Sequence, residues 1–94
     1  MDPNTILRCV ADKYTVNVSQ LQSLSQKQNV VEARFMFFLI TRELTGKSYH
    51  LIGNYVNRNH CTVIYGARKI RELMAAYPGI KSLYKKIKDE ITME

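Results

Sequence analysis

Several residue types that support common architectures are scarce in this chain. Its 94 residues include two cysteines, two prolines, four glycines and no tryptophan. Two cysteines cannot form a dense disulfide framework and no segment resembles a signal peptide, so the expected compartment is a reducing cytoplasm. The longest apolar run, residues 35–40, is much shorter than the roughly 20 residues that span a bilayer, so we expect no membrane partner.

Acidic residues are also scarce. The chain has 14 Lys or Arg against 8 Asp or Glu, which gives a formal net charge of +6. The excess is local, because residues 33–71 contain seven Lys or Arg and only one acidic residue, Glu43. Such a segment suits a polyanion, although a small basic domain can also owe its charge to solubility alone. A chain of this length forms one domain, residues 1–94, with no space for a second.

The apolar residues recur at helical spacing along most of the chain. This periodicity predicts an all-α fold, a compact cluster of five to six helices. We expect helices at residues 3–14, 19–24, 30–44, 49–56, 60–77 and 80–91, with a polar loop at 25–29. Asp2 and Ser19 are the expected N-caps of the first two, Gly46 is a suitable C-cap for the central helix, and Pro78-Gly79 forces a break.

Residues 48–70 have the pattern of a helix-turn-helix. Ser48 can cap a short helix whose inward residues are Leu51, Ile52 and Val56, and Gly53 leaves room for a close helix contact. Asn57 tolerates the left-handed backbone of a tight turn, and Asn59 can cap the second helix.

The second helix of this segment has two distinct faces. One face is an apolar stripe made of Val63, Ala67, Ile70 and Met74. The opposite face is basic and can form hydrogen bonds, and it carries Cys61, Tyr65, Arg68 and Lys69. A recognition helix needs this division, because one face docks on the domain while the other enters a major groove.

The same segment resembles the C-terminal DNA-binding domain (domain IV) of the DnaA family of bacterial replication initiators, whose helix-turn-helix is of the Trp-repressor type. The matching residues are Ile52-Gly53, Val56, Arg58-Asn59-His60-Cys61-Thr62-Val63 and Ala67-Arg68-Lys69-Ile70. Residues 31–45 are similar to the long helix that precedes this motif in the family. The resemblance implies sequence-specific binding of double-stranded DNA in replication initiation or its regulation. We find no P-loop pattern and no room for the initiator's ATPase domain, so we expect no nucleotide or other cofactor.

The resemblance also implies which residues contact DNA. The expected reading edge is Arg58, Asn59, His60, Cys61 and Thr62, followed along the groove by Ile64, Tyr65, Arg68 and Lys69. The expected phosphate contacts are Arg34, Arg42 and Ser48, while Tyr49 and His50 stand where the family presents apolar groups to thymine methyls. His60 and Thr62 lie in the first turn of the helix, where backbone N–H groups already favour a phosphate.

Four departures from the family pattern lie in the motif and in the loop before the long helix. Asn59 replaces an Asp and would pair more naturally with adenine than with cytosine, and Cys61 replaces a Thr or Ser. The turn at Val56-Asn57 is one residue shorter than the family's common form. In the family, a basic loop before the long helix reaches the minor groove. The corresponding residues 25–29 carry only one charge here, on Lys27, so we expect lower affinity or relaxed selectivity compared with a full initiator.

Other functions are less well supported by the sequence. A helical interaction module could use Tyr49, Tyr55 and Tyr65 against a protein partner, and RNA is a weaker option because the major groove of an A-form duplex is deep and narrow. His60 and Cys61 are adjacent, so their side chains diverge on a helix, and with His50 and Cys9 they show no zinc-ligand spacing. A cysteine–histidine nucleophile pair could still meet in space. We expect no catalytic or metal site, and hence no enzyme.

Overall fold

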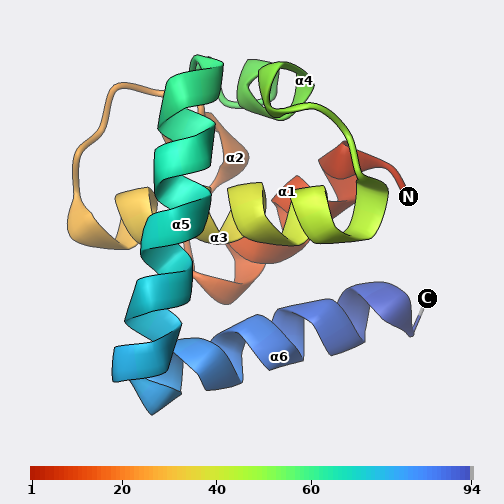
Figure 1. Ribbon diagram of the computed structural model, residues 1–94, viewed down its shortest axis with the longest axis vertical. Coiled ribbons are helices and arrows are strands. Elements are labelled where there is room, and N and C mark those ends of the chain that lie inside the picture. The colour runs from red at the N-terminus through yellow and green to blue at the C-terminus, as the bar shows by residue number, and fades with distance from the viewer. Residues whose placement is uncertain (94) are drawn as a thin grey trace.

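Six α-helices form the domain in the computed structural model, which describes residues 1–93 (Figure 1). They are α1 (Pro3–Lys13), α2 (Val18–Leu21), α3 (Gln28–Thr45), α4 (Tyr49–Asn54), α5 (His60–Ala76) and α6 (Pro78–Thr92). The part of the chain that the structure describes contains no strand, and the predicted all-α cluster is confirmed. None of these helices is long and apolar enough to cross a membrane.

The central helix α3 contacts each of the other five helices. Its buried side chains include Phe37 and Phe38, each of which stabilises the fold by about 1.5–3 kcal/mol. Helix α5 crosses α3 steeply, as Figure 1 shows, and Gly66 faces Phe35 and Phe38 of α3. A Cβ atom at Gly66 would lie 2.5 Å from Cδ1 of Phe35 and 2.8 Å from Cδ2 of Phe38. Glycine at this position therefore allows the close approach of the two helices.

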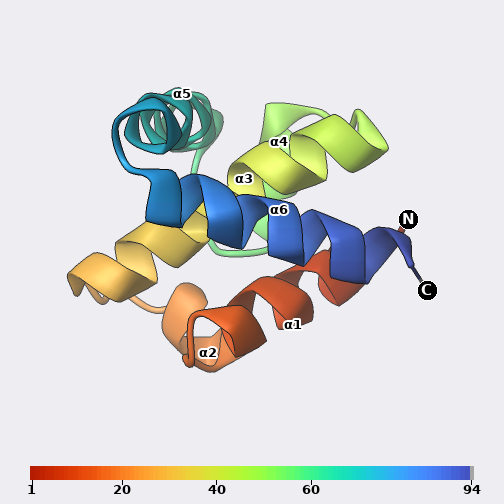
Figure 2. The same ribbon diagram turned by 90° about the horizontal axis from the view of Figure 1, so that it is seen from below.

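The last helix, α6, covers another part of the core. It lies against α1, α3 and α5, and the start of α1 and the end of α6 lie on the same side of the molecule (Figure 2). Ile87 and Ile91 are its buried residues. Pro78 ends α5 as predicted, and it also opens α6 at the first helical position, where its missing N–H leaves no bond unmade.

The second helix differs from its prediction. We expected residues 19–24 with Ser19 as N-cap, but α2 begins after Asn17 and ends at Leu21. The Asn17 side chain accepts a hydrogen bond from the Gln20 backbone N–H at 2.8 Å, and Gln20 Oε1 accepts one from the Asn17 N–H at 2.9 Å. This capping box fixes the start of the helix. Leu24 lies beyond the helix and is 87% exposed, so its predicted inward packing is wrong.

Candidate nucleic-acid interface

The caps of the helix-turn-helix agree with the sequence. Ser48 Oγ accepts a hydrogen bond from the Leu51 N–H at 3.2 Å and so caps α4. Asn57 has a φ of 58°, which is the left-handed conformation expected of it. Asn59 Oδ1 accepts from the Thr62 N–H at 2.9 Å and caps α5. These three predictions are confirmed.

The inner face of the motif follows the prediction except at one position. Ile52 and Val56 are fully buried, as are Val63 and Ile70 in α5. Leu51 was also expected to face inward but is 51% exposed. Helix α4 ends at Asn54, earlier than the predicted Val56, so Val56 is buried from the turn that follows. Ile52 lies on the buried face of α4, whereas Leu51 lies about 100° around the axis from it.

The opposite face of α5 is open to solvent. Cys61, Ile64, Tyr65 and Arg68 are all exposed there, with Ile64 at 41% and Tyr65 at 50%. Lys69 is half-buried and lies 3.9 Å from Glu72. The structure thus gathers the residues expected along the groove on one side of a helix that is fixed to the core by its other side.

The first turn of α5 contains an arrangement that the sequence did not indicate. The His60 ring packs against the His50 ring of α4, with 4.1 Å between the ring centroids and 31° between the planes. Cys61 Sγ lies 3.6 Å from His60 Nε2. Residues 50 and 60 are too far apart for a local spacing rule, so only the fold shows that these two candidate contact residues meet.

Arg58 is tied back to the protein. Its Nη1 donates to the carbonyl of Val56 at 2.9 Å and of Asn57 at 3.3 Å, and its Nη2 donates to the carbonyl of Ser23 at 2.6 Å. The side chain is half-buried. Its guanidinium therefore braces the turn against the loop that follows α2 and does not extend freely from the start of α5.

Arg34 requires a correction. It was expected to contact phosphate, but only 3% of it is exposed. Its guanidinium donates to the carbonyls of Gln20, Leu21, Ser23 and Ser25 at 2.7–3.1 Å. Burial lowers the pKa of Arg34, and the nearby charge of Arg58 lowers it further. A planar guanidinium has several N–H donors and can bind several carbonyls at once, so Arg34 stabilises the fold from inside the domain.

The remaining candidates lie on the surface around the motif. Arg42 stacks over the Tyr49 ring, with Cζ 4.5 Å from the ring centroid, and donates to the Lys47 carbonyl at 2.7 Å. Lys27 is exposed just before α3, and Ser48 is exposed at the start of α4. A cation thus lies at each of two helices that pack on α5, with Lys27 at the start of α3 and Arg42 over Tyr49 of α4.

Comparison with known proteins shows the family to which this motif belongs. Residues 3–70 match the family described as the bacterial DnaA protein helix-turn-helix. The chain belongs to this family. It is 38% identical over 76 residues to the chromosomal replication initiator protein DnaA of Nitrosospira multiformis, which covers 80% of this chain and 16% of that protein. It is 32% identical over 92 residues to the DnaA protein of Thermus thermophilus, covering 97% of this chain and 21% of that protein. The chain spans about a fifth of the length of these relatives.

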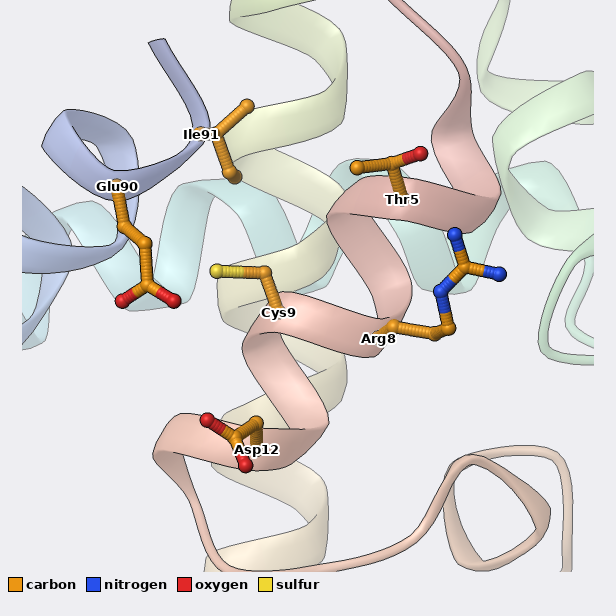
Figure 3. Close-up of a pocket in the computed structure, with 6 residues that line it drawn as sticks. All are labelled: Thr5, Arg8, Cys9, Asp12, Glu90 and Ile91. Atoms are coloured by element: carbon orange, nitrogen blue, oxygen red, sulfur yellow. The ribbon is translucent and has the colours of Figure 1, made fainter. Parts of the chain in front are cut away.

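Outside the motif, this DnaA-type domain has a cavity of about 240 Å³ between α1 and α6 (Figure 3). Its lining residues are Thr5, Arg8, Cys9, Asp12, Glu90 and Ile91. Lys13, near this cavity, forms an ion pair with Glu90 at 2.6 Å. Among residues 1–93, no group of three or more His, Cys, Asp or Glu side chains is placed to hold a metal ion.

Proposed function

We propose that this domain binds double-stranded DNA with sequence selectivity, by inserting the N-terminal half of α5 into a major groove, in replication initiation or its regulation. The observation that carries the proposal is the division of α5. Val63, Ala67 and Ile70 are buried against the domain, while Cys61, Ile64 and Arg68 face solvent. A helix held in this way can enter a groove without any loss of core packing. Membership in the DnaA helix-turn-helix family supports the same conclusion.

Charge around α5 favours the backbone of a duplex. Lys27, Arg42, Lys47 and Arg68 all lie on the elements that flank or form the motif. The free backbone N–H groups in the first turn of a 17-residue helix add a partial positive charge at the end that would meet the DNA. Together these groups would supply the non-specific, salt-dependent part of the affinity.

The cap geometry sharpens the proposed role of Asn59. Its Oδ1 already accepts two hydrogen bonds, from the Thr62 N–H at 2.9 Å and from Thr62 Oγ1 at 3.2 Å. The Nδ2 group remains as a donor for an acceptor in the groove, such as purine N7, guanine O6 or thymine O4. Unlike the Asp of the family pattern, Asn59 would therefore not select cytosine N4.

The interaction-module alternative has less support. Of its three tyrosines, Tyr49 is covered by Arg42 and Tyr55 packs against Phe37 with 6.3 Å between ring centroids. Only Tyr65 is at least half exposed, and one edge-on contact with Phe35 already fixes its ring. A surface that presents one tyrosine is a weak basis for a protein partner, so we do not propose this function.

The test is fluorescence anisotropy with a duplex that carries a DnaA box and a scrambled duplex of equal length, at two salt concentrations. We expect the box to bind at least about tenfold more tightly, which corresponds to about 1.4 kcal/mol. Arg68→Ala should weaken binding to both duplexes, because it removes a cation beside the groove. Arg71→Ala is the matched control, since it removes the same charge from an exposed position on the same helix, near α6.

Two results would count against the proposal. Equal, weak binding of both duplexes with a steep salt dependence would show that the fold and charge remain but that the sequence preference is absent. Absence of binding at low salt would remove DNA recognition altogether and direct attention to protein partners.

A further inference from the structure

The loop between α2 and α3, residues 22–27, lies beside the exposed face of α5. A cleft of about 400 Å³ separates them, with Gln26 and Gln28 on one wall and Tyr65 and Lys69 on the other. Figure 1 shows this loop swinging out from α2 and returning to the start of α3, next to α5. Lys27 is exposed at its end. A duplex that holds α5 in its major groove would therefore pass its adjacent backbone and minor groove near Lys27.

A reciprocal pair of amide hydrogen bonds joins this loop to the turn of the helix-turn-helix. Asn57 Nδ2 donates to the Gln22 carbonyl at 3.0 Å, and Gln22 Nε2 donates to the Tyr55 carbonyl at 3.0 Å. These residues are more than 30 positions apart in the chain. The two bonds therefore connect segments that no local structure would hold together.

Arg34 and Arg58 meet at the next residue of the loop, Ser23. The Ser23 carbonyl accepts from Arg58 Nη2 at 2.6 Å and from Arg34 Nη2 at 2.8 Å. Arg34 also binds the Ser25 carbonyl at 2.7 Å. Since Arg34 belongs to the central helix and Arg58 to the turn before α5, their shared acceptor fixes the loop to both elements at once.

We infer that Gln22, Asn57 and Arg58, anchored by Arg34, form a tether that positions the loop relative to α5, so that Lys27 and the recognition helix contact one duplex together. This inference rests on the proposed function. The named side chains are positioning residues, and Lys27 is the contact that they position. A loop held in its bound conformation loses less conformational freedom on binding, so its contact contributes more to the affinity.

The test uses surface residues, because a change at the buried Arg34 could unfold the domain. The variant Gln22→Ala/Asn57→Gly removes both amide bonds of the tether and leaves the net charge unchanged. Glycine tolerates the φ of 58° at position 57, so the turn keeps its backbone conformation. The matched control is Asn4→Ala/Asn54→Ala, which removes two amides from exposed positions on α1 and α4 that make no bond in the tether.

The measurement is the effect of Lys27→Ala on the affinity for the box duplex in three backgrounds. In the parent and in the control variant, we expect Lys27→Ala to weaken binding by about fivefold. In the tether variant it should weaken binding by less than about twofold, because only the arginine bonds to Ser23 and Ser25 still hold the loop and Lys27 is no longer fixed beside α5. Arg68→Ala should cost the same factor in all three backgrounds.

The alternatives give different patterns. A merely structural role would reduce the effects of Lys27→Ala and Arg68→Ala equally, and this result would overturn the inference. An equal effect of Lys27→Ala with and without the tether would also overturn it, as would no effect of Lys27→Ala in the parent. If the parent binds neither duplex, the proposed function fails first and this inference fails with it.

Discussion

Charged side chains join helices in two regions of this domain, but their partners differ. On the side of α1 and α6, lysines meet carboxylates: Lys13 pairs with Glu90 at 2.6 Å and Lys88 with Glu43 at 3.5 Å. Around the helix-turn-helix, the arginines at positions 34, 42 and 58 donate to backbone carbonyls. A carbonyl satisfies a guanidinium N–H without cancelling its charge. Each ion pair in the first region is thus neutral, while the second region combines structural bonding with a positive field that a polyanion can use.

The largest effect is expected where the arginine–carbonyl arrangement is buried. Arg34→Met should reduce the free energy of unfolding by on the order of 3 kcal/mol or more, because four carbonyls lose their donor. Chemical denaturation would measure this loss. Arg8→Met on α1 is the control, since Arg8 is exposed and should change stability by about 0.5 kcal/mol or less. Similar losses in the two variants would show that the carbonyl cluster does not stabilise the fold.

Unlike the charged contacts of these two regions, the contact of α5 with α3 is assumed to depend on packing. Gly66→Ala tests this assumption, because its Cβ would lie 2.5 and 2.8 Å from ring atoms of Phe35 and Phe38. Such overpacking should destabilise the domain by about 1–3 kcal/mol in thermal unfolding. Gly79→Ala in α6 is the counterpart, since no atom lies within 4 Å of its added Cβ and a helical alanine should be neutral or stabilising. A neutral Gly66→Ala would mean that the crossing is looser than the structure shows.

The features of this fold that the sequence predicted correctly are those that depend on neighbouring residues in the chain. The caps at Asp2, Ser48 and Asn59 and the left-handed Asn57 each depend on a few neighbouring residues. The early start of α2 also had a local signal, because Asn17 and Gln20 have the spacing of a capping box. The neighbouring Ser19 offered a competing cap of the same chemistry.

The parts that were missed depend on distant segments. Arg34 was expected to contact phosphate because the family resemblance implied it, but its acceptors come from residues 9 to 14 positions away and surround it only in the folded chain. The bonds between Gln22 and the turn and the stacking of His50 on His60 likewise form only in the folded chain. Gly66 did carry a signal, since a glycine inside a helical pattern often marks a close contact.

The two regions should also differ in how much one of their cations contributes to the salt dependence of DNA binding. If Arg42 contacts one phosphate, Arg42→Gln should make the salt dependence of DNA binding shallower. The magnitude of the negative slope of log affinity against log salt should fall by about 0.9. Lys88→Gln should leave that slope unchanged, because Lys88 already binds Glu43 and lies 3.1 Å from the Tyr84 hydroxyl. Anisotropy titrations of both variants over a range of salt concentrations would measure the slopes. Each variant loses one positive charge, so any difference between them reflects position and not net charge. Equal reductions would mean that the domain attracts DNA through its overall charge, and that the carbonyl-bound arginines confer no advantage.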